Sequence, residues 1–325
     1  MAHMLTQRAN TRTEMAYVGD TPWHGLGQVL TAAADIDTWK REAGMEWQIK
    51  RSPVRYGEGP EQRIFDDRHV LFRSDTKAPL GIVSPQYKVV HPGQVLEFFS
   101  DLVGAAGFRL ETAGTMFGGA RFWGLARVSE DAVVVGQDRV GGYLLLSTSC
   151  DGSLATEARF TTVRVVCHNT LSMALGVRAA AGTRVAISHR TRFDPAAVKA
   201  RLGVATDQFA EFMQAARHLA RKPVRTAVAE TAVEALLTRE KVVAGDADKV
   251  KASPAYQRIM GLFAGAALGG GLSSAEGTAW GLVNAVTEYV DHHSRARAVD
   301  NRLANAWYGR GDTLKTAALE AALAL

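Results

Sequence analysis

The segment Arg159 to Leu175, RFTTVRVVCHNTLSMAL, gathers side chains that could do chemistry within a β-branched and apolar run. It carries five polar or charged residues of a catalytic or binding type: Arg159, Arg164, Cys167, His168 and Asn169. Two positive charges in such a segment are costly to bury unless acidic or polar groups meet them. The segment therefore admits two interpretations, a nucleophilic site or an element that faces a nucleic acid.

The nucleophile interpretation depends on Cys167 and His168, which are adjacent in the sequence. Neighbouring residues point to opposite faces of a strand and lie about 100° apart on a helix. The histidine that activates a cysteine usually comes from elsewhere in the fold. A cysteine that follows two valines is typical of a small packed side chain. We therefore predict no catalytic residue here, and an enzyme that uses Cys167 on a small molecule stays an alternative.

A second alternative is a metal-dependent nuclease. Four residues that could serve it surround a predicted hairpin turn: Asp66, Asp67, Asp75 and Lys77. Aspartate and lysine are also common at such turns for conformational reasons. The histidines and cysteines show no H-x-x-x-H or C-x-x-C spacing, so no metal or other cofactor is predicted. No G-x-x-x-x-G-K-[ST] loop is present, which argues against ATP hydrolysis.

Basic and aromatic residues alternate along the predicted strands, and this pattern suits a nucleic acid. Phosphates attract arginine and lysine, and unstacked bases stack on aromatic rings. The competing interpretation is that the arginines face solvent while the aromatic rings fill the core. The predicted nucleic-acid-binding residues are Lys50, Arg51, Arg55, Tyr87, Lys88, Arg121, Trp123, Arg159 and Arg164.

The composition of the chain is that of a basic globular protein, which suits a nucleic-acid partner. The chain has 325 residues, 47% hydrophobic and 22% charged, and a formal net charge of +5, which favours a polyanionic partner. The two cysteines are too few for a disulfide framework, and the N-terminus has no apolar signal segment. No apolar run approaches the roughly 20 residues of a membrane helix. We expect a cytoplasmic protein with no membrane partner.

The order of predicted elements indicates an α+β fold with an antiparallel hairpin, a β-meander and packed helices, followed by a helical C-terminal region. We divide the chain into an N-terminal arm (1–31), an α+β core (32–193) and a helical region (194–325). The core begins with a helix over 35–44 and a hairpin that turns at 74–77. A helix follows from Pro92, and glycines at 104 and 107 end it. The predicted meander strands are 108–114, 120–128, 132–136 and 142–149, with turns at Gly118-Gly119 and Gly141-Gly142.

Amphipathic spacing predicts the helices of the C-terminal region. We expect helices over 198–219 and 226–237 and a mobile polar segment over 241–254. A glycine hinge at 269–271 then precedes one long helix over 276–308.

Four runs of sequence carry a family resemblance: TPWHGLG (21–27), SPQYKVVHPGQVLEFFSDL (84–102), RVVCHNTLSMAL (164–175) and GTAWGLVNAVTEYVDHH (277–293). Together they resemble the phage/plasmid-like protein family, a domain of unknown function, over about Thr21 to Ala317. The resemblance implies a mobile-element context and transfers no active-site residue. The order of elements is also similar to the core of single-strand annealing proteins of the Red-beta and Erf type. Those proteins form rings or filaments and bind single strands in a basic groove without ATP.

These observations lead to one prediction of function. We expect an ATP-independent protein that binds and anneals single-stranded DNA during homologous recombination of a mobile element. It would act without catalysis of its own, as a homo-oligomer in the form of a ring or filament. The TPWHGLG arm and the C-terminal helices would contact other subunits, and the resemblance also admits a partner exonuclease.

Overall fold

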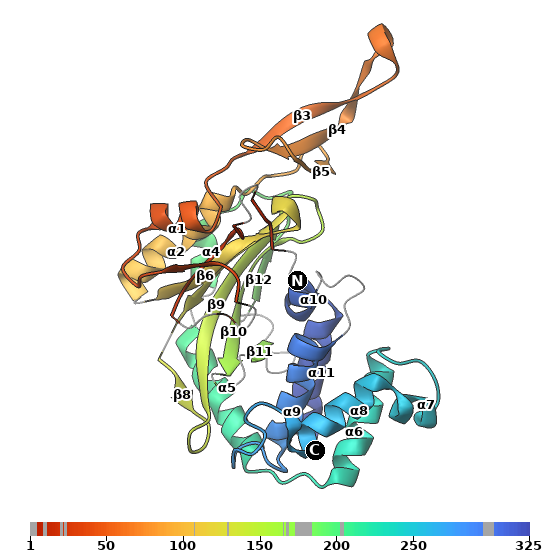
Figure 1. Ribbon diagram of the computed structural model, residues 1–325. Helices are drawn as coiled ribbons and strands as arrows, with labels where there is room; N and C mark the ends of the chain where they lie inside the picture. Colours follow the sequence, from red (N-terminus) through yellow and green to blue (C-terminus); the bar gives the residue numbers. More distant parts are fainter. Residues whose placement is uncertain are drawn as a thin grey trace.

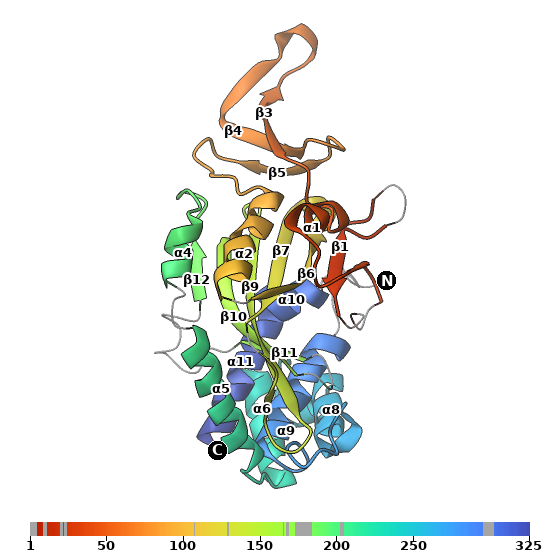
Figure 2. The same cartoon turned by 90° about the vertical axis from the view of Figure 1, so that its left-hand side faces the viewer.

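Figure 1 shows the computed structural model, in which a large sheet with packed helices forms the body of the molecule. A β-ribbon projects from one end of this body, and most of the C-terminal helices gather at the other end, as the turned view also shows (Figure 2). The structure describes residues 5–8, 12–19, 22, 25–106, 108–128, 130–164, 166, 169–172, 184–201, 205–294 and 302–325. The predicted α+β class is confirmed.

The main sheet has nine strands among the described residues. They are β1 (Met15–Val18), β2 (Gln28–Leu30), β6 (Arg109–Met116), β7 (Arg121–Arg127), β8 (Ala132–Val133), β9 (Arg139–Ser149), β10 (Thr156–Arg164), β11 (Asn169–Ser172) and β12 (Arg184–Ile187). The strand order is β11-β10-β9-β7-β6-β1-β2, with β12 also paired to β10 and β8 to β9. All pairs are antiparallel except β1 with β2. Part of the expected N-terminal arm is therefore an edge of this sheet.

Both faces of the sheet are covered. Side chains along β7 point alternately to one face and to the other, and each face packs against its own core. Phe122 belongs to the core cluster that contains the side chains of helix α2 (Pro92–Ala106), and Phe99 of that helix packs against Gly124. Trp123 points to the opposite face, where its ring meets Trp307 edge-on at 5.8 Å between ring centroids. Successive side chains of a strand point to opposite faces, so one strand contributes to two cores.

The second sheet is the projecting ribbon. It contains β3 (Ile49–Tyr56), β4 (Arg63–Arg73) and β5 (Pro79–Val83), in the order β3-β4-β5. The predicted hairpin that turns at 74–77 is confirmed, because β4 and β5 pair on either side of this turn. Strand β5 pairs only with His69 to Phe72, so the outer part of the ribbon has two strands. We call this outer part, residues 54–68, the arm. It is a different segment from the N-terminal arm that we expected over residues 1–31.

The remaining helices are α1 (Ile36–Glu42), α4 (Pro195–Arg201), α5 (Ala205–Ala220), α6 (Thr226–Arg239), α7 (Ala247–Ala252), α8 (Pro254–Gly261), α9 (Ala279–Glu288), α10 (Arg302–Tyr308) and α11 (Arg310–Ala324). The predicted first helix is confirmed, and Asp35 caps it by accepting a hydrogen bond from the Thr38 amide at 2.8 Å. None of the helices in the described part of the chain combines the length and apolarity that a bilayer-spanning segment needs.

Two predictions of local structure are wrong, one long helix over 276–308 and a turn at Gly141-Gly142. The long helix is interrupted, because α9 runs into a wide π-type turn at 289–293 and the backbone becomes extended at Ser294. The polar segment 241–254 contains α7, which Asp246 caps. Gly141 and Gly142 lie inside β9. A side chain at Gly141 would come within 2.9 Å of the Asp131 carboxylate and the Tyr143 ring, which explains the glycine.

Candidate nucleic-acid interface

Five of the seven sequence-predicted cations form two groups in the structure. Lys50, Arg51 and Lys88 lie at the base of the ribbon, where it joins the body. Arg159 and Arg164 lie on β10 and are buried in the body. Of these two groups, only the first can meet a ligand without unfolding the protein.

An open groove of about 590 Å³ lies beside the first group. We call it the arm-base groove. Its lining residues are Ser84, Tyr87, Gly152, Leu154, Ala155, Ala186, Ser188, His189 and Arg190. They come from the segment after β5, the turn between β9 and β10, and the end of β12. Because β12 pairs with β10, the tertiary fold brings residues 84 and 190 to the same groove.

Tyr87 and His189 form the packed inner wall of the groove. Their rings stack at 4.4 Å between centroids with an interplanar angle of 14°. The Tyr87 hydroxyl donates to the Ser149 carbonyl at 2.9 Å, and burial raises the pKa of this phenol. The His189 ring nitrogens lie 3.0 Å from the carbonyl oxygens of Lys88 and Leu154. These contacts hold the wall rigid.

The cations surround this wall. Arg51 donates to the backbone carbonyls of Pro85 (3.3 Å) and Tyr87, which fixes its guanidinium at the base of the ribbon. Lys88 and Arg190 are exposed, and neither forms an ion pair with an acidic side chain in the described part of the chain. Carbonyl oxygens carry no net charge, so the contacts of Arg51 do not neutralise its guanidinium.

Arg121 lies on the far side of the turn that borders the groove. Its Nε donates to the hydroxyl of Ser153 at 3.0 Å, and its guanidinium lies over the Phe117 ring at 4.9 Å. It is partly exposed, so it extends the basic region beyond the groove. Arg55 is exposed on the arm, away from the groove.

Two aromatic predictions are contradicted by burial. Trp123 is fully buried, and its ring packs against Trp307 between the sheet and α10. Tyr87 retains 9% of its surface, and one face of its ring is covered by His189. Stacking on a base needs a free ring face, so neither ring serves as a platform in this structure.

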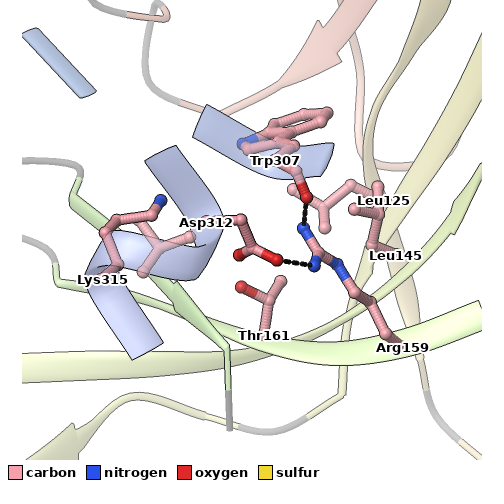
Figure 3. Close-up of a pocket in the computed structure, with 8 residues that line it drawn as sticks. Leu125, Leu145, Arg159, Thr161, Trp307, Asp312 and Lys315 are labelled. Atoms are coloured by element: carbon pink, nitrogen blue, oxygen red, sulfur yellow. Dashed lines mark hydrogen bonds and ion pairs between the residues drawn. The ribbon is translucent and has the colours of Figure 1, made fainter. Parts of the chain in front are cut away.

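Arg159 is also not available to a phosphate. Figure 3 shows its guanidinium bound to two groups of the C-terminal helices. It donates to the Asp312 carboxylate at 2.7 Å and to the Trp307 carbonyl. Burial works against this charge, but the carboxylates of Asp312 and Glu157 outweigh it and raise the pKa of Arg159. The cavity beside it holds about 10 Å³, too little for any nucleotide. Arg159 instead fastens α10 and α11 to the sheet.

Arg164, the second arginine of the run, pairs with Asp138. Its Nε and Nη2 donate to the two carboxylate oxygens at 2.8 and 2.9 Å, and both side chains are buried. Ser274 and the Trp280 indole donate to the same carboxylate at 2.6 and 3.0 Å. The prediction that Arg164 meets a phosphate is wrong, because an acid from another segment already neutralises it.

The alternative sites gain no support from the geometry. Asp67 and Arg73 lie six residues apart on β4, about 20 Å along a strand, and Arg73 donates a hydrogen bond to the Asp75 carboxylate at 2.8 Å. Within the described residues, no group of three or more metal-ligating side chains gathers. Cys167 and His168 lie outside the described residues. Cys150 is buried, and burial raises the pKa of its thiol to about 12, which makes it a poor nucleophile.

Sequence reasoning missed His189 and Arg190. The run SHRTR (188–192) is a visible basic signal, but it follows a short strand and nothing local connects it to residue 87. Its importance comes from the pairing of β12 with β10.

Comparison with known proteins gives one match. The family model described as "Domain of unknown function (DUF932)" covers residues 79–307. No curated protein and no solved structure matches the chain. The matched region includes every residue that lines the arm-base groove and excludes the arm.

Proposed function

The chain belongs to the DUF932 family, a domain of unknown function, and on that premise we propose that it binds single-stranded DNA in the arm-base groove. We propose further that it anneals such strands without ATP, as a homo-oligomer that serves recombination of a mobile element. The observation that carries the proposal is an open groove that Arg190 lines, with two more cations beside its wall: the Lys88 carbonyl contacts the His189 ring, and Arg51 donates to the Tyr87 carbonyl.

The positive charges beside the groove support a polyanion as its ligand. The three cations lie on three segments that are distant in the sequence, and Lys88 and Arg190 have no acidic partner among the described residues. Uncompensated positive charge along a groove attracts a phosphate backbone and releases its counterions. The formal net charge of +5 acts in the same direction.

The lining also supports a single strand. Leu154, Ala155 and Ala186 contribute apolar surface beside the cations. An unpaired strand presents base faces as well as phosphates, so a groove with both kinds of surface suits it. A duplex keeps its base faces stacked inside and presents mainly its phosphates and groove edges.

The test is the affinity of the purified chain for an oligo(dT) strand as a function of salt. For a single strand, the logarithm of the binding constant falls by about 0.7 per phosphate contact for each tenfold rise in salt. Three or four contacts predict a slope near −2 to −3 on this basis. Annealing is measured in parallel, as the rate at which two complementary labelled strands pair without ATP.

Each of three results would overturn a different part of the proposal. Absence of oligo(dT) binding at low salt removes the whole proposal. Binding that is equally tight to duplex DNA of the same length removes the preference for single strands. Binding without faster annealing leaves a single-strand binder and removes the annealing step.

A further inference from the structure

The arm has an exposed apolar face. Val54 pairs with Phe65 and Tyr56 with Arg63, which places Val54, Tyr56 and Phe65 on one face of the ribbon, with Arg63 at its end nearest the tip. The rings of Tyr56 and Phe65 pack edge to face at 6.4 Å, yet these side chains remain 55% and 44% exposed. A two-stranded hairpin alone is marginally stable in water. Burial of this face against another surface would therefore stabilise the arm.

The charge of the arm argues for a protein partner. Residues 54–68 contain the three arginines 55, 63 and 68 and the four acids 58, 61, 66 and 67, a formal net charge of −1. Glu58 and Glu61 stand at the tip, and both are exposed. An acidic tip repels a phosphate backbone, so the arm is a poor continuation of the basic groove.

A matching hollow lies on the body. A pocket of about 530 Å³ opens between α1, α2 and residues of strands β6 and β7. We call it the α1–α2 pocket. Its apolar wall contains Val18, Ala34, Ile36, Trp39 and Val103, and its charged residues are Asp35, Arg109, Glu111 and Arg127. Pockets of 300 Å³ and more accept several side chains, so two aromatic rings fit the available volume.

We propose that the arm of one copy docks in the α1–α2 pocket of a second copy and places Tyr56 and Phe65 against its apolar wall. The acidic tip then lies near Arg109, whose side chain is 57% exposed and whose present partner, Glu130, is itself on the surface. Such an exposed ion pair contributes little and exchanges readily for another carboxylate.

The contact is head to tail. In both views the arm points away from its own body, so the pocket that receives it belongs to another molecule (Figures 1 and 2). A contact between two different surfaces leaves a free arm at one end and a free pocket at the other. Repetition of such a contact closes into a ring or continues as a filament. This inference shares with the proposed function only the expectation of a homo-oligomer, and it does not depend on DNA binding.

The first test is the molar mass of the full chain in solution, measured by light scattering over a range of concentrations. The unmodified chain is expected to assemble. The double variant Tyr56→Ser with Phe65→Ser and the variant Val103→Glu are each expected to be monomers. The matched control is Ile64→Ser, because Ile64 is similarly exposed but pairs with Arg55 on the opposite face of the ribbon.

The second test mixes the two monomeric variants. The arm variant retains an intact pocket and the pocket variant retains an intact arm, so the mixture is expected to form a dimer and nothing larger. A symmetric contact between two arms would give no dimer in this mixture. Thermal unfolding of each variant, compared with the unmodified chain, verifies that each one is folded.

The proposal is overturned if the unmodified chain is a monomer at all concentrations, if the arm variant still assembles, or if the folded variants fail to form a dimer when mixed. Oligo(dT) binding by the monomeric variants separates the two proposals. Assembly as described together with no binding to DNA would leave the arm contact standing and remove only the proposed function.

Discussion

Arg73 and Glu14 join the base of the ribbon to the main sheet through a buried ion pair. They are 59 residues apart in the sequence, and two guanidinium nitrogens donate to the two carboxylate oxygens at 3.0 and 2.7 Å. Thr115 donates to the same carboxylate, and the guanidinium lies over the Trp47 ring at 4.3 Å. This arrangement fixes the base of the ribbon to the main sheet.

Removal of one partner from this pair is expected to destabilise the protein strongly. Glu14→Gln leaves the Arg73 charge buried with only Asp75 as an acidic partner, and breaking a buried pair costs about 3–5 kcal/mol. Urea denaturation measures the loss. The exposed pair of Lys251 and Glu234 offers the control, because Lys251→Ala should leave the denaturation midpoint nearly unchanged. Equal effects of the two substitutions would contradict this account of the ribbon base.

His91 is expected to make stability depend on pH. Its Nδ1 accepts a hydrogen bond from the Ile49 amide at 3.2 Å, at the start of the ribbon. Burial, with a further effect of the Lys50 ammonium, lowers the pKa of His91 below its ordinary value of 6.5. The unfolded chain therefore binds a proton near pH 6.5 that the native chain does not, and the free energy of unfolding falls as the pH drops below that value. The stabilisation that the neutral His91 provides is fully present above pH 6.5.

The measurement for His91 is the difference in unfolding free energy between the unmodified chain and His91→Gln, followed from pH 8 to pH 5. The amide oxygen of glutamine can accept the same hydrogen bond without titrating, so the advantage of the unmodified chain should shrink as the pH falls. A difference that stays constant over this range would show that His91 does not titrate on unfolding.

The groove cations are expected to contribute separately to DNA binding. Lys88→Ala and Arg190→Ala should each weaken oligo(dT) binding and reduce the magnitude of the salt slope by about 0.7, because each removes one phosphate contact. Lys249→Ala on α7 is the matched control, since that lysine is exposed and lies far along the chain from the groove. If Lys88→Ala and Arg190→Ala both keep the salt slope of the unmodified chain, as the control does, the DNA binds elsewhere.

Arg164 is expected to affect stability and leave DNA binding unchanged. Arg164→Met leaves the Asp138 carboxylate buried with only neutral donors, and the expected loss is again about 3–5 kcal/mol. The fraction of the variant that stays folded should bind oligo(dT) with the affinity of the unmodified chain. A folded variant with a reduced salt slope would return Arg164 to the interface.

Local patterns in the sequence were sufficient for the elements whose stability is local. The Asp35 cap defines α1, the turn at 74–77 defines the hairpin of β4 and β5, and apolar spacing defines α2. Prediction was wrong where a distant contact overrides the pattern. Gly141 and Gly142 suggest a turn, but they belong to a strand because they pair with Val163 and Thr162 of β10.

The availability of each charge was decided by the tertiary structure alone. The sequence determined that arginines occur on the strands, and that the chain is an α+β protein of net positive charge. It could not determine that Asp138 meets Arg164 from 26 residues away, or that Asp312 meets Arg159 from 153 residues away. A basic side chain attracts a phosphate only where no acid of its own chain reaches it, and long-range packing sets that condition. Lys88 and Arg190 meet it at the arm-base groove, whereas Arg159 and Arg164 do not.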